Sequence, residues 1–460
     1  MAGEPWDDIV RVDRSDPRFF SCGGRWYWPI GLNLRSPNDL RSHDNLHTAV
    51  TPDRGTYSYH AYLERFARSG GTATEVWMAP WSLGLEWNSS WFGFHGLGRY
   101  SQSNAWRLEH VLDDALAHGV RINLVISNHG QASSDSDREW QGSPYNAANG
   151  GPVAHSPELF TDSRALAMQD RSRRYIVARY ADHPGVMGWK LWSEVNLTPI
   201  GANSVAWHRQ AADRWHGLDV YRHPVTTHWA DDYRSAELAV VSLPQLDFAC
   251  IDAYYRRDIL ADVLMNSTLN PARGLARFGK PILVSEYGGR EFGAPSAQLA
   301  AELACSGFAS LVSGHAGMPM LWWWEWVDQG DRWAPYGAIA RFIDGEDIRG
   351  TRAGSAKLYA IAAGRELWCH AWRRQGRILG YVLDPEWVKD GVREDDLSQG
   401  RLQAGVIDAG GMAIEWWDAD RGERLSSEHL DHLGGGLTLP MPTFRRHLAF
   451  KLIRDPVPGP

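Results

Sequence analysis

The sequence has few cysteines, no long apolar run and no surplus of basic residues. Its four cysteines, Cys22, Cys250, Cys305 and Cys369, are too few and too scattered for a disulfide framework, and none forms a CxxC pair. No stretch reaches the roughly 18 consecutive apolar residues of a membrane-spanning helix. The 47 Lys and Arg are outnumbered by 55 Asp and Glu, so the basic stripe of nucleic-acid binders is missing. We therefore expect neither a membrane nor a nucleic acid as a partner.

The first ten residues lack the apolar segment of a secretory signal peptide and carry Glu4, Asp7 and Asp8 instead. This beginning leaves the cellular compartment undetermined. A leader removed from a longer form would indicate a secreted or periplasmic protein.

Tryptophan is the residue type in excess, with 24 in 460 residues. The total of 43% hydrophobic and 22% charged residues is otherwise typical of a globular protein. Core packing by itself does not call for Trp322, Trp323, Trp324 and Trp326 almost in a row. A ligand with flat apolar faces is therefore indicated.

Eight short apolar runs recur at a spacing that averages about 41 residues, and several are apolar on both faces, as expected of buried parallel strands. The runs are Pro29–Leu34, Thr72–Met78, Arg121–Ser127, Val186–Trp192, Pro224–Trp229, Asp247–Ala253, Pro281–Glu286 and Pro319–Trp324. Amphipathic segments with helical spacing separate them, at 62–68, 108–116, 166–180, 205–215 and 297–313. Alternation of strand and helix eight times predicts a (β/α)8 TIM barrel.

The pattern changes near residue 365, where short apolar runs are divided by Gly, Asp and Pro turns. We expect two domains: a catalytic barrel over residues 1–358 and a small C-terminal β-sandwich over residues 359–460. The sequence predicts long loops at 80–104 and 128–157, on the barrel face that carries active sites.

Two carboxylates stand where a barrel carries its chemistry, Glu194 after the fourth run and Glu286 at the end of the seventh. A carboxylate at the end of a buried strand is costly unless it is hydrogen-bonded or functional. Strands four and seven face each other across a barrel, so both groups can reach one substrate atom. Hydrolysis of a glycosidic bond with retention requires such a pair, about 5–5.5 Å apart.

Around these residues the sequence resembles the retaining glycoside hydrolases of clan A, most closely the cellulase and mannanase family 5. The resemblance covers roughly residues 15–350 and rests on Val284-Ser285-Glu286-Tyr287-Gly288 and on Leu191-Trp192 with Glu194. It implies that Glu194 is the general acid/base and Glu286 the nucleophile.

Three positions depart from the family pattern. Ser193 replaces the asparagine that binds the sugar 2-hydroxyl, Asp252 lies where many relatives carry histidine, and Glu75 is the nearest equivalent of a supporting arginine.

The resemblance also implies substrate-binding residues at the ends of other strands. They are Asn128 and His129 after the third run, His228 in the fifth, Tyr254 or Tyr255 after the sixth, and Ser193 itself. A tyrosine here often hydrogen-bonds the nucleophile in these families. Trp322 resembles the aromatic platform under the sugar, and Trp81 and Trp87 extend it, because sugar C–H faces suit large rings.

The sequence thus predicts a retaining glycosidase that cleaves β-linked glucan or mannan by double displacement, as a monomer or simple homo-oligomer. No cofactor is expected. An inactive glycan-binding barrel is the alternative that the three departures leave open. A metal-dependent hydrolase using His129, His228 and Asp231 is weaker, because HxH and HExxH motifs are lacking.

Overall fold

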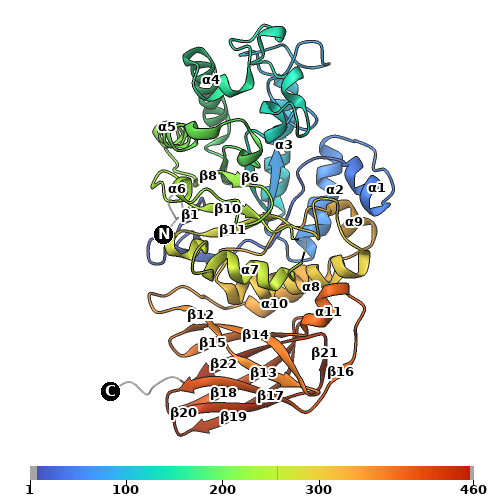
Figure 1. Ribbon diagram of the computed structural model, residues 1–460, viewed down its shortest axis with the longest axis vertical. Helices are drawn as coiled ribbons and strands as arrows, with labels where there is room; N and C mark the ends of the chain where they lie inside the picture. Colours follow the sequence, from blue (N-terminus) through green and yellow to red (C-terminus); the bar gives the residue numbers. More distant parts are fainter. Residues whose placement is uncertain (1–7, 256, 456–460) are drawn as a thin grey trace.

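The computed structural model describes residues 8–255 and 257–455 and consists of a barrel of parallel strands followed by an antiparallel β region (Figure 1). One parallel sheet has the order β4-β5-β6-β7-β8 and a second has the order β11-β10-β9. Leu321 closes the ring through parallel bridges to Leu32 of β4 and to Tyr287 just after β11. The predicted barrel is therefore present, and its eighth segment is a short irregular strand.

The barrel strands are β4 (Gly31–Leu32), β5 (Ala73–Trp77), β6 (Arg121–Val125), β7 (Val186–Lys190), β8 (Val225–Thr226), β9 (His228–Trp229), β10 (Ala249–Asp252) and β11 (Ile282–Glu286). The surrounding helices are α2 (Thr56–Arg68), α3 (Gln102–Ala117), α4 (Ser163–Tyr180), α5 (Ser204–Leu218), α6 (Leu238–Val241), α7 (Leu260–Leu269), α8 (Ser296–Ser313) and α10 (Ala334–Ile343). The five predicted helical segments lie in α2, α3, α4, α5 and α8.

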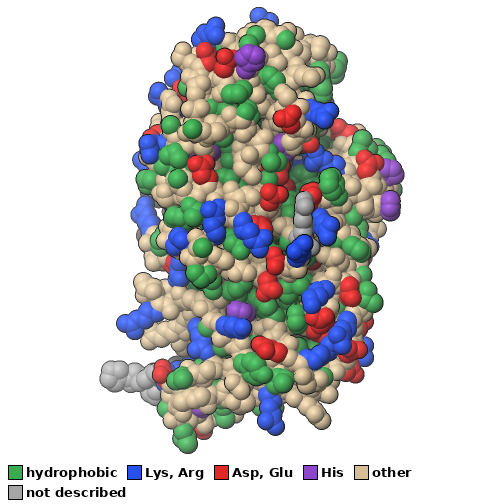
Figure 2. Space-filling view, viewed as in Figure 1, with side chains coloured by type: hydrophobic (Ala, Val, Ile, Leu, Met, Phe, Trp, Pro, Cys, Tyr) green, Lys and Arg blue, Asp and Glu red, His purple; other side chains and the backbone are tan. Residues whose placement is uncertain are grey.

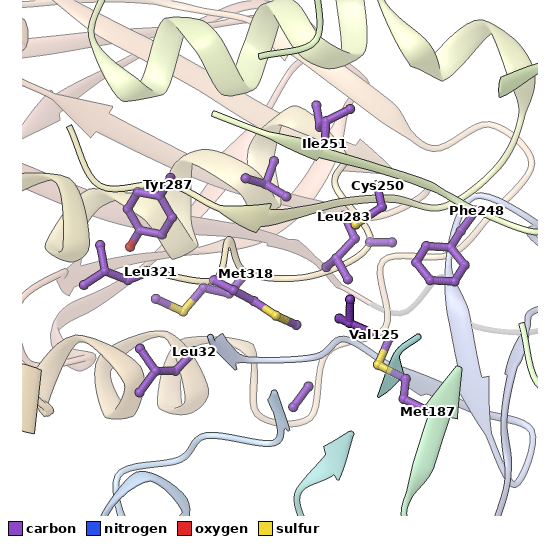
Figure 3. Close-up of a cluster of buried hydrophobic side chains, with 14 of the residues drawn as sticks. Leu32, Val125, Met187, Phe248, Cys250, Ile251, Leu283, Tyr287, Met318 and Leu321 are labelled. Atoms are coloured by element: carbon purple, nitrogen blue, oxygen red, sulfur yellow. The ribbon is translucent and has the colours of Figure 1, made fainter. Parts of the chain in front are cut away.

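Buried apolar side chains from many strands meet in one cluster (Figure 3). Leu32, Val125, Met187, Cys250 and Leu283 belong to five different strands and are each at most 1% exposed. Dense apolar packing of this kind leaves the carboxyl ends of the strands as the place where polar groups converge.

Two predicted strand ends need correction. The run Pro319–Trp324 does not stay extended, because α9 (Trp324–Gln329) begins at Trp324. The run Val186–Trp192 is regular only to Lys190. Beyond it, the chain still pairs with its neighbours: Leu191 N–H donates to Thr226 O at 2.9 Å.

Loops and a small sheet cover the two ends of the barrel. A meander of β1 (Val10–Val12), β2 (Phe20–Cys22) and β3 (Arg25–Tyr27) lies against β7. Helix α1 (Leu40–Leu46) contacts α9. The long loop after β6 folds into short 3-10 turns, η1 (His129–Ala132), η2 (Glu139–Gly142), η3 (Ala147–Asn149) and η4 (Ser156–Phe160). Further turns are η5 (Val195–Leu197), η6 (Gly201–Asn203) and η7 (Leu275–Phe278).

The C-terminal region is an antiparallel β assembly that packs on helix α8 (Figure 1). Its strands are β12 (Gly354–Lys357), β13 (Tyr359–Ala362), β14 (Arg365–Arg374), β15 (Arg377–Leu383), β16 (Asp396–Leu397), β17 (Gly400–Ile407), β18 (Gly410–Asp418), β19 (Glu423–His432), β20 (Gly435–Met441), β21 (Phe444–Arg445) and β22 (His447–Arg454), with α11 (Pro385–Asp390) inserted. Strand β14 pairs with β12 along its second half and with β13 along its first half, so it joins two parts of the sheet. A separate apolar cluster is enclosed between them. A stack of Phe308 on Tyr381, with ring centroids 5.2 Å apart, ties the region to the barrel helices.

No helix of the described residues is both long and apolar enough to cross a membrane. Acidic and basic side chains alternate over the face seen in Figure 2, without an expanse of one sign.

Candidate active site

Glu194 lies just past β7, at a left-handed turn of the chain. Ser193 N–H donates to Ser127 O at 2.8 Å, and Ser193 forms a parallel bridge with Asn128, so the strand pairing continues to the residue before Glu194. Glu194 itself has φ 55° and ψ 49° and precedes η5. A left-handed conformation is uncommon for a residue with a side chain and clusters at functional sites. The turn ends the strand and leaves the carboxylate 17% exposed.

Glu286 is the last residue of β11 and is 2% exposed. The Tyr254 hydroxyl donates to Glu286 Oε2 at 3.3 Å, and the Ser193 hydroxyl reaches Glu286 Oε1 at 3.4 Å. His228 Nδ1 lies 4.0 Å from the same Oε1. The structure therefore brings three of the expected binding residues to the expected nucleophile.

Ser193 and His228 connect the two glutamates. His228 Nδ1 accepts the backbone N–H of Glu194 at 3.2 Å and lies 2.9 Å from Ser193 Oγ. The other ring nitrogen, Nε2, contacts Asp252 Oδ1. Because the same two side chains also approach Glu286, both glutamates belong to one site at the carboxyl ends of the strands.

Burial is the main electrostatic influence on Glu286. It raises the pKa of this carboxyl to about 8, and the neighbouring charge of Glu194 acts in the same direction. The cations Lys190 and Arg35 partly oppose this shift. Glu286 consequently keeps a proton at a pH well above the ordinary range of a carboxylic acid.

His129 is the cation beside Glu194. Its Nδ1 is 2.8 Å from Glu194 Oε2, and its Nε2 is 3.4 Å from Asp137 Oδ2. Burial alone would lower the pKa of His129, but Asp137 and Glu194 outweigh it and raise the pKa to about 10. Arg41 holds Asp137 in turn at 2.6 Å. His129 is therefore positively charged at neutral pH and orients the Glu194 carboxylate.

A fully buried ion pair lies inside the barrel beneath the two glutamates. Lys190 Nζ is 2.7 Å from the Glu75 carboxylate and donates to Ser285 Oγ at 2.9 Å. The Asn123 amide donates to Glu75 Oε1 at 2.8 Å. Related enzymes carry a supporting arginine near the position of Glu75. In this protein Glu75 is an acid, and its cationic partner is Lys190 of β7. Lys190 was not among the residues expected in the site, although a lysine inside an apolar strand run is visible in the sequence.

We expect the variant Lys190→Met to lose about 3–5 kcal/mol of stability, because Glu75 would remain buried without its cation. The double variant Lys190→Met, Glu75→Gln should recover much of this loss, since no buried charge remains unpaired and Asn123 keeps a partner. Urea denaturation of both variants measures the difference. Equal stability of Lys190→Met and the unchanged protein would contradict this account.

Tryptophan rings pack around one arginine at the barrel rim, and the charge of this arginine, Arg35, acts on Glu286. The Arg35 guanidinium lies 4.2 Å from the ring centroid of Trp322, 4.8 Å from that of Trp81 and 5.2 Å from that of Trp324, and it pairs with Asp39. Cation–π contacts of this kind hold rings in fixed orientations. Trp322 and Trp81 were expected here from the sequence, whereas Arg35, which follows the first strand, was not.

The remaining expected residues divide into two groups. Asn128 donates to the Glu139 carboxylate at 3.3 Å, and the Trp81 indole N–H donates to the same group at 2.8 Å, so both lie on the loop wall beside Glu194. Tyr255, in contrast, directs its hydroxyl to Glu302 of α8 and is not brought to Glu286.

Trp87 is likewise not brought to the glutamates. It lines a separate cavity of about 120 Å³ whose wall also includes Trp192, Trp207, Glu86 and Arg173. This cavity lies between the strands and the helices α4 and α5, because its wall includes Leu191 together with Ile176 of α4 and Trp215 of α5.

The metal hypothesis is not supported by the geometry of the described residues. Two groups there could offer three ligands, His60–Asp114–His118 and His228–Asp252–Glu286. In the second group both His228 ring nitrogens already make hydrogen bonds, which leaves no lone pair for an ion. Asp231, proposed as a partner of His129 and His228, instead accepts a hydrogen bond from Ser235.

Comparison of the fold finds glycoside hydrolases. A family 5 glycoside hydrolase from Bacteroides vulgatus superimposes with a TM-score of 0.62 at 12% identity, covering 99% of this chain and 95% of the other. A putative glycoside hydrolase from the same organism gives 0.61 at 14% identity, covering 99% and 84%. The endo-β-1,4-mannanase from Thermotoga petrophila gives 0.53 at 15% identity, covering 93% and 98%.

No protein-family model matches the chain, and no curated protein matches it significantly. At these identities the comparison shows the fold: a barrel architecture shared with glycoside hydrolases, which includes a C-terminal β region.

Proposed function

We propose that the protein is a retaining glycoside hydrolase that cleaves β-glycosidic bonds in a neutral polysaccharide or oligosaccharide of the glucan or mannan type. The observation that carries this proposal is the joint attachment of Glu194 and Glu286 to Ser193 and His228 at one end of the barrel. The glycoside hydrolases with the same fold support it, and a mannanase among them supports the inclusion of mannans.

In the proposed mechanism each glutamate has the role that the resemblance to clan A implies, which requires the proton of the pair to lie on Glu194 when the substrate is attacked. Glu286 attacks the anomeric carbon, the bond to the leaving oxygen breaks, and that oxygen takes the proton of Glu194. Glu194 then takes a proton from water while the water oxygen attacks the anomeric carbon. The ester bond breaks and the Glu286 carboxylate is restored. Tyr254 donates to Glu286 Oε2, which stabilises the charged form before attack and after release.

The rim tryptophans provide the surface for the sugar. Trp322 and Trp81 are fixed by Arg35 and by Glu139, so little side-chain entropy remains to be lost on binding. Their rings suit the C–H faces of a pyranose, and the backbone N–H of Trp322 donates to the carbonyl O of Tyr287, the residue after Glu286, which favours a place at the cleavage point.

We expect the unchanged protein to release sugar from at least one aryl β-glycoside or β-linked polysaccharide, with the β-anomer formed first. A substrate screen read by product mass, followed by ¹H NMR of the first product, measures both. Formation of the α-anomer first would contradict the retaining mechanism. Binding of glycans without cleavage of any of them would favour the alternative of an inactive glycan-binding barrel.

A further inference from the structure

A chain of buried polar groups runs from Asp252 through His228 to Ser193 and ends at Glu286. Asp252, His228 and Ser193 are each 0% exposed. Asp252 Oδ1 contacts His228 Nε2, His228 Nδ1 is 2.9 Å from Ser193 Oγ, and Ser193 Oγ is 3.4 Å from Glu286 Oε1. The chain starts on β10, crosses β9 and reaches the residue before Glu194, so it spans three neighbouring strands.

A backbone amide determines the tautomer of His228. The N–H of Glu194 can only donate, and it points to Nδ1 at 3.2 Å, so Nδ1 must carry a lone pair. The ring proton is therefore on Nε2, where Asp252 accepts it. Burial lowers the pKa of His228, and the nearby cations Lys190 and His129 add to this effect. His228 is thus neutral, with one defined tautomer.

The Ser193 hydroxyl faces two acceptors but has a single proton. It can donate either to His228 Nδ1 or to Glu286 Oε1. While Glu286 is charged, the hydroxyl gains most by donating to the carboxylate. When that charge is lost, on protonation or on formation of the glycosyl ester, His228 Nδ1 provides the second acceptor.

A serine–histidine–aspartate chain is also the arrangement of a nucleophilic triad, but the surroundings argue against that use. Ser193 is fully buried, so a substrate carbonyl has no approach to its oxygen. The hydroxyl lies against Glu286, a negative or proton-bearing group rather than a set of donors that would stabilise an oxyanion.

We propose that His228, held in its Nε2–H tautomer by Asp252, is a positioning residue for both glutamates. Its Nδ1 accepts the backbone N–H of Glu194 and so holds the left-handed turn. The same atom offers the Ser193 hydroxyl a second acceptor, so that this hydroxyl donates to Glu286 when Glu286 is charged and to His228 when it is neutral. The expected effect of His228 on kcat rests on the proposed glycosidase function. The tautomer of His228 and its hydrogen bond to the Glu194 turn do not rest on that function.

The matched variants His228→Asn and His228→Leu test the proposal. Asn and Leu have similar size and leave a similar space in place of the ring, but only Asn keeps an acceptor near the position of Nδ1. We expect His228→Leu to lower kcat about 100-fold through displacement of Glu194, with KM nearly unchanged, and His228→Asn to keep most of the activity. Equal losses in both variants would overturn the proposal, because the ring would then act only by filling space.

A second measurement needs no substrate and no variant. ¹H–¹⁵N correlation spectra of the ¹⁵N-histidine-labelled protein at neutral pH report which ring nitrogen of His228 carries hydrogen, with His228→Asn used for assignment. A proton on Nε2 and none on Nδ1 supports the proposal. A proton on Nδ1, alone or with one on Nε2, overturns it whether or not the protein proves to be a glycosidase.

Discussion

The variant Glu286→Ala is expected to lose turnover of an aryl β-glycoside by roughly 10⁴-fold or more, a loss of the size seen when a nucleophile is removed. The reason is that no other described carboxylate at the rim is held against both Ser193 and Tyr254. Sodium azide should restore turnover and yield the α-glycosyl azide, because the small anion fills the position of the carboxylate and attacks once.

The same substitution at Glu109, on the outer surface of α3, provides the control and should leave activity unchanged. Full activity of Glu286→Ala would remove the nucleophile assignment. Rescue that yields only the β-azide would contradict a direct attack from the Glu286 side.

Stability gives an independent check on Glu286. Its pKa in the folded state, about 8, lies above the 4.5 of an ordinary glutamic acid, so the folded state binds this proton more tightly than the unfolded state. The group therefore costs stability progressively as the pH rises from 4.5 to 8. Glu286→Gln should be more stable than the unchanged protein at pH 8, and the difference should shrink toward pH 4.5. Thermal unfolding across this range measures it.

The second large effect is expected for Glu194→Gln, which removes the proton donor but keeps the size of the side chain. Hydrolysis of substrates with poor leaving groups should fall about 10²–10⁴-fold, while cleavage to the glycosyl ester should persist for leaving groups that need no proton. Burst kinetics with an activated aryl glycoside would reveal the ester accumulating, because Glu194 can no longer activate water.

The pH profile should change with the same variant. In the unchanged protein, kcat/KM is expected to rise with pH up to about 8, where Glu286 loses its proton and becomes a nucleophile. In Glu194→Gln this rise should move to lower pH, because the charge of Glu194 no longer raises the pKa of Glu286. A rise that stays at the same pH in Glu194→Gln would assign it to a group other than Glu286.

Strand positions and the two glutamates could be found from the sequence because their signals are local. Runs such as Ile282-Leu283-Val284 are apolar on both faces, and this pattern alone identifies them as buried parallel strands. The irregular eighth strand was harder to foresee. Trp322 and Trp323 favour an extended chain by type, but Trp324 begins a helix, a choice set by tertiary packing.

The residues that contact the two glutamates could not all be predicted from the local sequence. Tyr254 and Tyr255 are adjacent and identical in type, yet only Tyr254 reaches Glu286, while Tyr255 turns to Glu302. Successive residues after a strand point in different directions, so one register step decides which one faces the site. Lys190 and Arg35 could not be assigned to the site from the sequence, because the groups that they contact come from other strands and loops.

The sequence by itself determined the order of strands and helices, the barrel class and the two rim carboxylates, since each depends on neighbours along the chain. Only the tertiary structure decided which groups surround Glu286, that Lys190 neutralises Glu75, and that His228 joins both glutamates. These contacts link residues tens to about a hundred positions apart. Their energies depend on burial and distance, and neither quantity exists before the chain has folded.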